Sequence, residues 1–276
     1  MAPSPIRSRL FRRPIQLLGG LGVTLACWGC GEVDFLSAAQ AIDDRGDLSI
    51  NYIPADIETY QDIQDSLEET QFFEDLVTDL NTIFALPEDI EVFFAECDEA
   101  NAYYDLDTVE ITICYELIDE YMTIFADDIV TEEDFDNEVI DAALFTFFHE
   151  LGHALVHQYE LPITGREEDA VDDFATIMLI DAYEDEAGVL SGLWQFEMEA
   201  IAEEDYLDDL PYWGEHSLSS QRFYNTACLI YGSDPEGYDF LVEEDYLPGD
   251  RAELCPDEYE QKSNAWWSLI EPYLLE

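Results

Sequence analysis

Residues 145–155 read FTFFHELGHAL and contain the pattern H-E-x-x-H, with histidines at positions 149 and 153. Apolar residues cover most of the circumference of the surrounding run, which predicts a buried helix from about Asp141 to Gln158. In a helix, residues four apart lie on the same face, one turn above the other. His149 and His153 can therefore present two imidazole rings to one metal ion, and Glu150 can reach a water molecule bound to that ion.

A simpler interpretation has two core histidines that are hydrogen-bonded to carboxylates, with no metal. The chain contains four histidines, and three of them, His149, His153 and His157, fall on this one helix. His157 lies two turns from His149, roughly 12 Å along the helix axis, so one ion cannot bind both. We expect His157 to face solvent or to be hydrogen-bonded. The clustering of the histidines favours the metal interpretation.

The composition limits the size of the folded domain and the kinds of molecule that the chain can bind. With 276 residues, 48% of them hydrophobic, the chain can form one large domain or two small ones with a real core. Its net charge is −57, and from residue 31 onward 66 acidic residues stand against five basic ones. Electrostatic repulsion therefore excludes nucleic acid and disfavours anionic membrane surfaces. We expect the folded chain to need screening by salt or divalent cations.

The first 30 residues have the layout of a secretory signal: a basic start, then a short apolar run. Cys27 and Cys30 are both candidates for a lipidated cysteine. We expect an exported protein that is periplasmic, extracellular or lipid-anchored, with membrane attachment only through a lipidated N-terminal cysteine. Residues 31–55 are predicted to be a tether, and residues 56–276 the folded domain.

Four cysteines remain after the leader, and export makes disulfides permissible. We predict that they pair locally, Cys97 with Cys114 and Cys228 with Cys255, because each pair flanks one compact segment. A cysteine-rich zinc site is the competing interpretation. It is disfavoured because no C-x-x-C spacing occurs after the leader.

The pattern of apolar residues predicts a mostly helical α+β fold. Residues 48–53 are expected to be extended, residues 56–83 to form one long helix or two short ones, and later helices to cover 188–206 and 218–231. Residues 90–97 are a strand candidate, and residues 109–114 alternate as a strand should. We expect the two to pair antiparallel across a turn at 101–108. A long acidic loop is expected at 127–136. The sheet would be small and antiparallel, beside the H-E-x-x-H helix.

A catalytic zinc site needs a third protein ligand and an open position. A helix is predicted from Thr164, the start of a capping box, to about Ile180, with Glu167 at its cap. Glu168 and Asp172, four residues apart, lie on the flank of its apolar face. We therefore predict Glu168 as the third ligand and Asp172 as the carboxylate that orients a ligating histidine. The alternative is a solvated acidic helix start. Three residues are expected to point away: Asp169, Asp173 and Thr176.

Together, H-E-x-x-H on one helix and E-x-x-x-D on the next resemble the gluzincin peptidases, a resemblance that implies zinc held by the glutamate and an aspartate bonded to a ligand histidine. More closely, the chain resembles a bacterial family of metallopeptidases catalogued as a domain of unknown function. The matching segments span about residues 90–270: ICYEL at 113–117, HELGHA at 149–154, GREEDA at 165–170, EHSL at 215–218, QRFYN at 221–225, and Cys255 with Glu258 and Tyr259. The short connection after His153 leaves the third ligand open among Glu167, Glu168 and Asp169.

Two residues of the C-terminal third are candidates for further roles. In gluzincin-like sites a distant histidine donates a hydrogen bond to the developing oxyanion, and His216 would play that part here. The alternative is a helix-start residue bonded to nearby acids or tyrosine. Arg222 would either stabilise an oxyanion or pair with a buried carboxylate.

The sequence thus predicts an exported, zinc-dependent, zincin-like hydrolase that acts on peptide or protein substrates. Zn²⁺ would be held by His149, His153 and Glu168, and Glu150 would be the general base on the zinc-bound water. The alternative is a non-catalytic exported protein that binds metal or a partner on a zincin scaffold.

Overall fold

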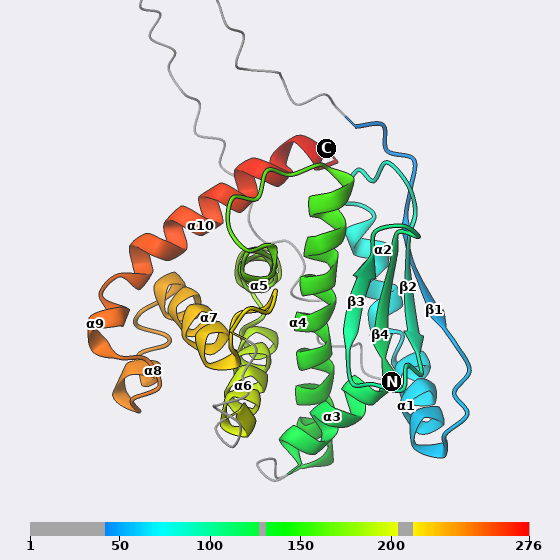
Figure 1. Cartoon of the computed structure of the whole chain (residues 1–276), viewed down its shortest axis with the longest axis horizontal. Coiled ribbons are helices and arrows are strands. Elements are labelled where there is room, and N and C mark those ends of the chain that lie inside the picture. The colour runs from blue at the N-terminus through cyan, green and yellow to red at the C-terminus, as the bar shows by residue number, and fades with distance from the viewer. Residues whose placement is uncertain (1–41, 127–130, 204–211, 276) are drawn as a thin grey trace, which may run out of the picture.

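The computed structural model describes residues 42–126, 131–203 and 212–275, so the expected leader and the first part of the expected tether lie outside the described residues. The chain forms one four-stranded sheet and a larger set of helices (Figure 1), which confirms the mostly helical α+β class. In chain order the elements are β1 (Leu48–Tyr52), α1 (Glu58–Thr70), α2 (Phe72–Leu80), β2 (Ile90–Ala95), β3 (Ala102–Asp105), β4 (Glu110–Cys114), α3 (Tyr115–Phe125), α4 (Glu132–Gln158), α5 (Glu167–Ile177), a π-helical turn (Met178–Ala182), α6 (Glu186–Glu203), α7 (Ser219–Ser233), α8 (Phe240–Glu243), α9 (Gly249–Ala252), α10 (Cys255–Ile270) and a 3₁₀ turn (Glu271–Tyr273).

The sheet is mixed, with the strand order β1-β2-β4-β3. The expectation that residues 90–97 and 109–114 pair antiparallel is wrong: β2 and β4 are parallel, with Val92 opposite Ile111. The reason is that residues 102–105, expected within a turn, form β3, which pairs antiparallel with β4 and reverses the chain between the two parallel strands. The alternation predicted for residues 109–114 holds in β4, because Ile111 and Ile113 are fully buried while Glu110 and Thr112 are only partly buried.

The folded part begins before residue 56. β1, which lies inside the segment expected to be a tether, pairs parallel with β2. The backbone N–H groups of Arg45 and Gly46 donate to the carbonyl oxygen of Leu86 at 2.8 and 2.9 Å. The second half of residues 31–55 therefore belongs to the sheet and its edge.

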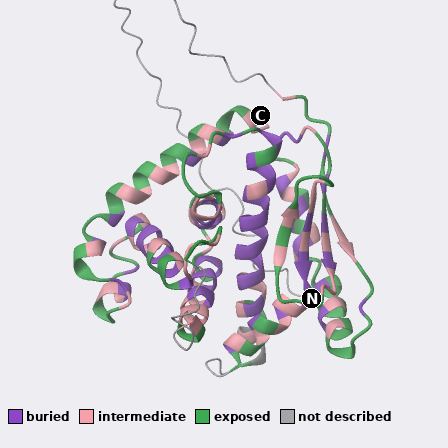
Figure 2. Cartoon of the chain, in the orientation of Figure 1, coloured by how far each residue is buried: buried purple, intermediate pink, exposed green. Residues whose placement is uncertain are grey.

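Helix α4 is the centre of the molecule. It runs between the sheet and the helices α5, α6 and α7 (Figure 1), and it is buried along most of its length (Figure 2). Within the described chain, the segment Phe135–Gln158 is long and apolar enough to cross a membrane, but 83% of its apolar window is buried inside the protein. We therefore interpret it as a core helix. It begins at Glu132, so residues 132–136 of the expected acidic loop are helical, and residues 127–130 lie outside the described part.

Two glycines allow neighbouring helices to approach α4 closely. A Cβ atom added at Gly152, inside the H-E-x-x-H pattern, would come within 2.9 Å of the side chain of Val171 on α5. A Cβ atom added at Gly192 on α6 would come within 2.2 Å of the Phe145 ring. Because real Cβ atoms do not pack so tightly, glycine at these positions sets the distance between the helices. Gly152 thereby brings α5 against the histidine-bearing face of α4.

Both predicted disulfides are present. Cys97–Cys114 links the segment after β2 to the end of β4, with Cα atoms 5.6 Å apart. Cys228–Cys255 links α7 to the first residue of α10, with Cα atoms 5.1 Å apart. The second disulfide fixes two helices that pack around α5.

Candidate metal centre

Helices α4 and α5 bring the three predicted ligands together. The Nε2 atoms of His149 and His153 lie 3.2 and 3.3 Å from the same carboxylate oxygen, Oε2 of Glu168. His149 is only 6% exposed, and the side chains of His153 and Glu168 are 15% and 17% exposed. The four-residue spacing on α4 and the first turn of α5 therefore converge on one small, largely buried volume.

A third imidazole reaches the same atom. The Nε2 atom of His216 lies 2.9 Å from Oε2 of Glu168, and its ring stacks on that of His149 with a centroid distance of 6.2 Å. His149, Glu168 and His216 offer ligand atoms that all lie within 4.8 Å of one another. His216 thus bonds a nearby acid shortly before α7, as the alternative expected, and that acid is the predicted ligand Glu168.

The outer nitrogens of the two α4 histidines each face a carboxylate. Nδ1 of His149 lies 2.7 Å from Oδ1 of Asp172, as predicted. Nδ1 of His153 lies 2.7 Å from Oε1 of Glu167. The expectation that Glu167 caps the helix is wrong: the N-cap residue of α5 is Arg166, and it makes no side-chain capping bond. A metal-ligating histidine usually has such a partner, so the second histidine was a signal that a second carboxylate should be sought.

Asp172 is itself held by Arg222, which comes from α7. Nε of Arg222 donates to Oδ2 of Asp172 at 2.8 Å, and Nη2 donates to Oδ1 at 2.7 Å. The guanidinium also lies 4.0 Å from the centre of the Phe196 ring. Burial raises the pKa of Asp172, but the charge and hydrogen bonds of Arg222 outweigh it and hold this pKa well below its usual range. Arg222 thus forms the buried pair with a carboxylate, one of the two roles expected for it.

The protonation of this cluster shows what it can bind. A neutral imidazole carries one N–H, and an ionised carboxylate has no proton to donate. With the Nδ1 proton of His149 used by Asp172 and that of His153 by Glu167, both Nε2 lone pairs would face the lone pairs of Glu168. The repulsion is relieved only by a second proton on each ring or by a cation between them.

The electrostatics of the cluster favour positive charge. Burial lowers the pKa of His149, but the hydrogen bonds of Asp172 and Glu168, together with the charges of Asp172 and Glu150, raise it to about 9. Burial raises the pKa of Glu168, yet hydrogen bonds from the three histidines bring it well below its usual range. A divalent cation at the Nε2 atoms would replace these protons and leave each ring as the tautomer that its outer carboxylate selects. Nitrogen and carboxylate donors of this kind fit zinc.

Glu150 follows His149 on α4 and is 5% exposed. Burial is the main cause that raises its pKa, opposed by the charges of His149 and His153. A carboxyl group whose pKa lies nearer to neutrality can both accept and release a proton during a reaction. Glu150 therefore has a buried environment, influenced by the charges of the cluster, that is suited to proton transfer.

Other residues near the cluster are structural. Asp173 and Thr176, expected to point away, are instead turned inward: Thr176 is fully buried, and Asp173 pairs with Lys262 at 2.8 Å. The reason is that α5 is enclosed by α4, α7 and α10 rather than covered on one face only. His157 is exposed and hydrogen-bonded through Nδ1 to the Tyr104 hydroxyl at 2.8 Å, consistent with its expected place outside the metal site.

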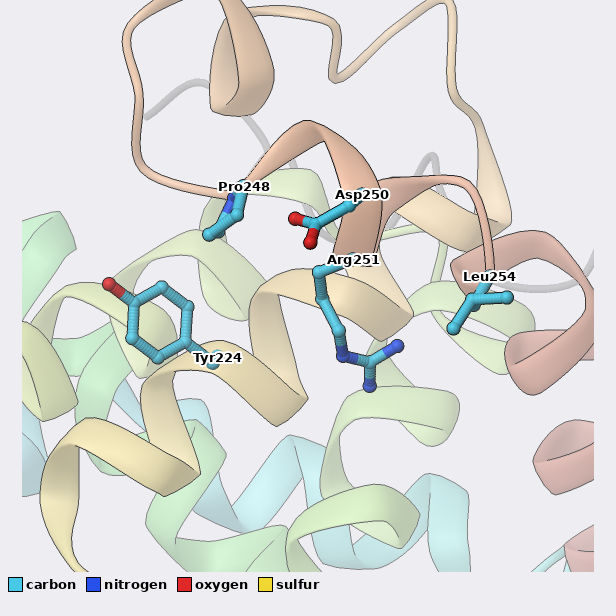
Figure 3. Close-up of a pocket in the computed structure, with 5 residues that line it drawn as sticks. All are labelled: Tyr224, Pro248, Asp250, Arg251 and Leu254. Atoms are coloured by element: carbon cyan, nitrogen blue, oxygen red, sulfur yellow. The ribbon is translucent and has the colours of Figure 1, made fainter.

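Two other features of the described chain do not form part of this centre. A pocket of about 400 Å³ between α7 and α9 (Figure 3) contains none of the predicted site residues, and its lining is almost entirely apolar. It is lined by Tyr224, Pro248, Asp250, Arg251 and Leu254. Cys97, Cys114 and Glu116 also cluster. However, the thiols form a disulfide, and Glu116 accepts hydrogen bonds from the backbone N–H groups of Cys97 and Asp98.

The fold and the site define an α+β protein with a buried cluster of histidine and carboxylate ligands around H-E-x-x-H. Residues 52–270 match the family model DUF4344, whose description is "Putative metallopeptidase". This match covers most of the chain, and the chain belongs to that family. Comparison with curated proteins and with solved structures found no match.

Proposed function

We propose that the protein is an exported zinc-dependent peptidase of the gluzincin type, built on a zincin-like scaffold. The observation that carries this proposal is the convergence of three imidazole Nε2 atoms on one oxygen of Glu168, with an outer carboxylate at Nδ1 of both α4 histidines. Membership of a metallopeptidase family supports it independently.

His149, His153 and Glu168 would hold the zinc ion. Glu168 is favoured over its neighbours because its carboxylate meets both Nε2 atoms, whereas Glu167 meets the outer nitrogen of His153. When bound there, Zn²⁺ supplies Lewis-acid chemistry that lowers the pKa of water and polarises a carbonyl group.

The side chains around the ligands have separate roles in the proposed reaction. Glu150 takes the proton of the attacking water at its buried carboxylate and delivers it to the leaving amine. His216 donates a hydrogen bond to the oxygen on which negative charge develops. Asp172 and Glu167 fix the orientation and the tautomer of the two imidazoles, and Arg222 keeps Asp172 ionised.

Export is supported by the signal-like segment 1–30 and by the two disulfides, which persist in oxidising compartments. A lipidated N-terminal cysteine would be the means of membrane attachment. The substrate would be a peptide or protein that tolerates a strongly acidic enzyme. Basic or neutral segments meet that condition, and acidic segments would be repelled.

A paired measurement of metal content and cleavage tests the proposal. We expect the purified mature chain to contain one zinc ion and to cleave a mixture of peptides. The Glu150→Gln variant should keep its zinc and lose cleavage, whereas His153→Ala should lose both. Glu260→Gln, an exposed carboxylate on α10, is the matched control and should change neither. If the wild type binds zinc but neither it nor Glu150→Gln cleaves any peptide, the chain is a metal-binding protein without turnover.

A further inference from the structure

The side chain of Arg166 holds the bend that carries His216. Nη1 of Arg166 donates to the main-chain carbonyl oxygens of Gly214, Glu215 and His216, at 3.3, 3.5 and 3.0 Å. Residues 214–216 form a bend rather than a helix or a strand, so regular backbone hydrogen bonding does not fix their conformation. The guanidinium therefore joins the start of α5 to the segment that precedes α7.

Three consecutive residues, beginning at Arg166, together contact the three histidines of the centre. Arg166 binds the main chain of His216, and Glu167 binds Nδ1 of His153. Glu168 lies within 3.3 Å of Nε2 of His153 and closer still to that of His216. One turn of chain at the N-terminus of α5 thus sets the position of the third imidazole as well as that of the two on α4.

The chemistry of the contact fits a positioning role. The chain has few cations among many carboxylates, and several of them bind carboxylates: Arg222 with Asp172, Arg251 with Glu258, and Lys262 with Asp173. Arg166 instead donates from one nitrogen, Nη1, to three consecutive main-chain carbonyl oxygens. Such a contact defines the shape of a segment.

The ring of His216 contacts Glu168 and stacks on His149, but its main chain lies on an irregular segment that Arg166 holds. Its side chain is 55% exposed, against 7% for His149 and 15% for His153. A half-exposed imidazole on an irregular segment has many accessible orientations unless its main chain is fixed. A fixed main chain limits these orientations and favours the observed one, in which Nε2 lies 2.9 Å from Oε2 of Glu168.

We infer that Arg166 is a positioning residue that acts through His216, keeping its imidazole at the metal centre. The kinetic consequence of this inference rests on the proposed peptidase function, but the geometry itself is tested without turnover. Loss of the Arg166 contact would release His216 and leave His149, His153 and Glu168 in place.

The first test uses the ring ¹⁵N resonances of the metal-free mature chain, which has only four histidines. Arg166→Met should move the His216 signals towards those of a free histidine and leave those of His149 and His153 unchanged. Arg166→Lys should restore most of the wild-type shift, because a single nitrogen makes all three contacts. Arg45→Met removes one exposed charge elsewhere and is the control. An unchanged His216 signal, or equal movement of all three rings, would overturn the inference.

The second test is a double-mutant cycle on the zinc-loaded chain. Arg166→Met should lower kcat about 10- to 100-fold, with KM and zinc affinity unchanged, and should cause no further loss in a His216→Ala background. Independent, multiplicative losses would contradict the inference. If the wild type shows no cleavage, the proposed function fails, and the resonance experiment still decides whether Arg166 positions His216.

Discussion

Gly152 and Val171 pack so closely that a Cβ atom on the glycine would lie 2.9 Å from the valine side chain. This contact joins α4 to α5 in the middle of the candidate metal centre. It lies between the histidines on one helix and the carboxylates of Glu168 and Asp172 on the other. Gly152 therefore sets the distance between α4 and α5 on which the ligand geometry depends, although it is not itself a ligand.

Replacing this glycine should open the centre. In Gly152→Ala the added methyl group must push α5 away or distort it, at a cost of about 1–3 kcal/mol of stability. We expect zinc affinity, measured by competition with a chelator, to fall at least about tenfold. Gly165→Ala is the matched control, since a Cβ atom added there would meet nothing within 4 Å in the described chain, and it should bind zinc as the wild type does. Equal affinities of the two variants would show that the close packing does not set the ligand geometry.

Removing Arg222 should destabilise the fold and weaken the centre together. Arg222→Met leaves the buried carboxylate of Asp172 without its guanidinium partner, and breaking such a pair costs about 3–5 kcal/mol. Chelator competition and urea unfolding should both report the loss. Arg251→Met, which breaks a more exposed pair with Glu258, is expected to cost about 1 kcal/mol or less. Similar losses in the two variants would argue against a special role for Asp172.

Asp173 predicts a pH dependence of stability that is separate from the metal ligands. Burial raises the pKa of its carboxyl from 3.8 to about 7, although Lys262 opposes the change. Between these values the folded chain holds a proton that the unfolded chain has lost, so this group's contribution to stability falls as the pH rises from about 4 to 7.

The Asp173→Asn variant tests this dependence. Urea unfolding in the presence of a chelator should show that the wild type loses about 1–4 kcal/mol more than the variant between pH 4.5 and 7.5, since one pKa unit corresponds to about 1.4 kcal/mol. If the two chains lose stability equally over this range, the buried carboxyl is ionised throughout and the pair with Lys262 outweighs its burial.

The excess of acidic residues predicts a strong dependence on salt. Repulsion between the carboxylates is screened as ionic strength rises, so the thermal midpoint of the metal-free chain should increase by at least about 5 °C between 0.05 and 1 M potassium chloride. Chloride is preferred to sulfate, because sulfate strengthens apolar burial in any protein. A midpoint that does not change with salt would contradict the expectation that the folded chain needs screening by salt or divalent cations.

The parts of the metal centre that follow from residue spacing within one helix were predictable from the sequence. The four-residue spacing of His149 and His153 required a helix, and the same spacing joined Glu168 to Asp172 on the next one. The contact of Glu167 with Nδ1 of His153 was not predicted, because a carboxylate at a helix start has a sufficient local explanation as a cap. That contact depends on the angle between α4 and α5, which the small size of Gly152 permits. A helical wheel describes one helix at a time and does not show this angle.

In the sheet, too, the local pattern was predictable from the sequence and the long-range pairing of strands was not. Alternation gave the buried face of β4, the neighbour of β2, correctly, because it reflects the period of a strand. Their parallel pairing was not visible, since it depends on β3 reversing the chain between them, and β3 has only four residues. Similarly, Thr176 was expected to face solvent because a wheel assumes one covered face, whereas α5 is enclosed by helices from three parts of the chain.

The most direct measurement is a crystal structure of the zinc-loaded mature chain, with the ion located by its anomalous scattering. The account predicts one zinc ion bonded to Nε2 of His149, Nε2 of His153 and a carboxylate oxygen of Glu168, each at about 2.0–2.2 Å, with one position open to solvent. A zinc ion bound elsewhere, or bound to these histidines with Glu168 beyond bonding distance, would contradict it.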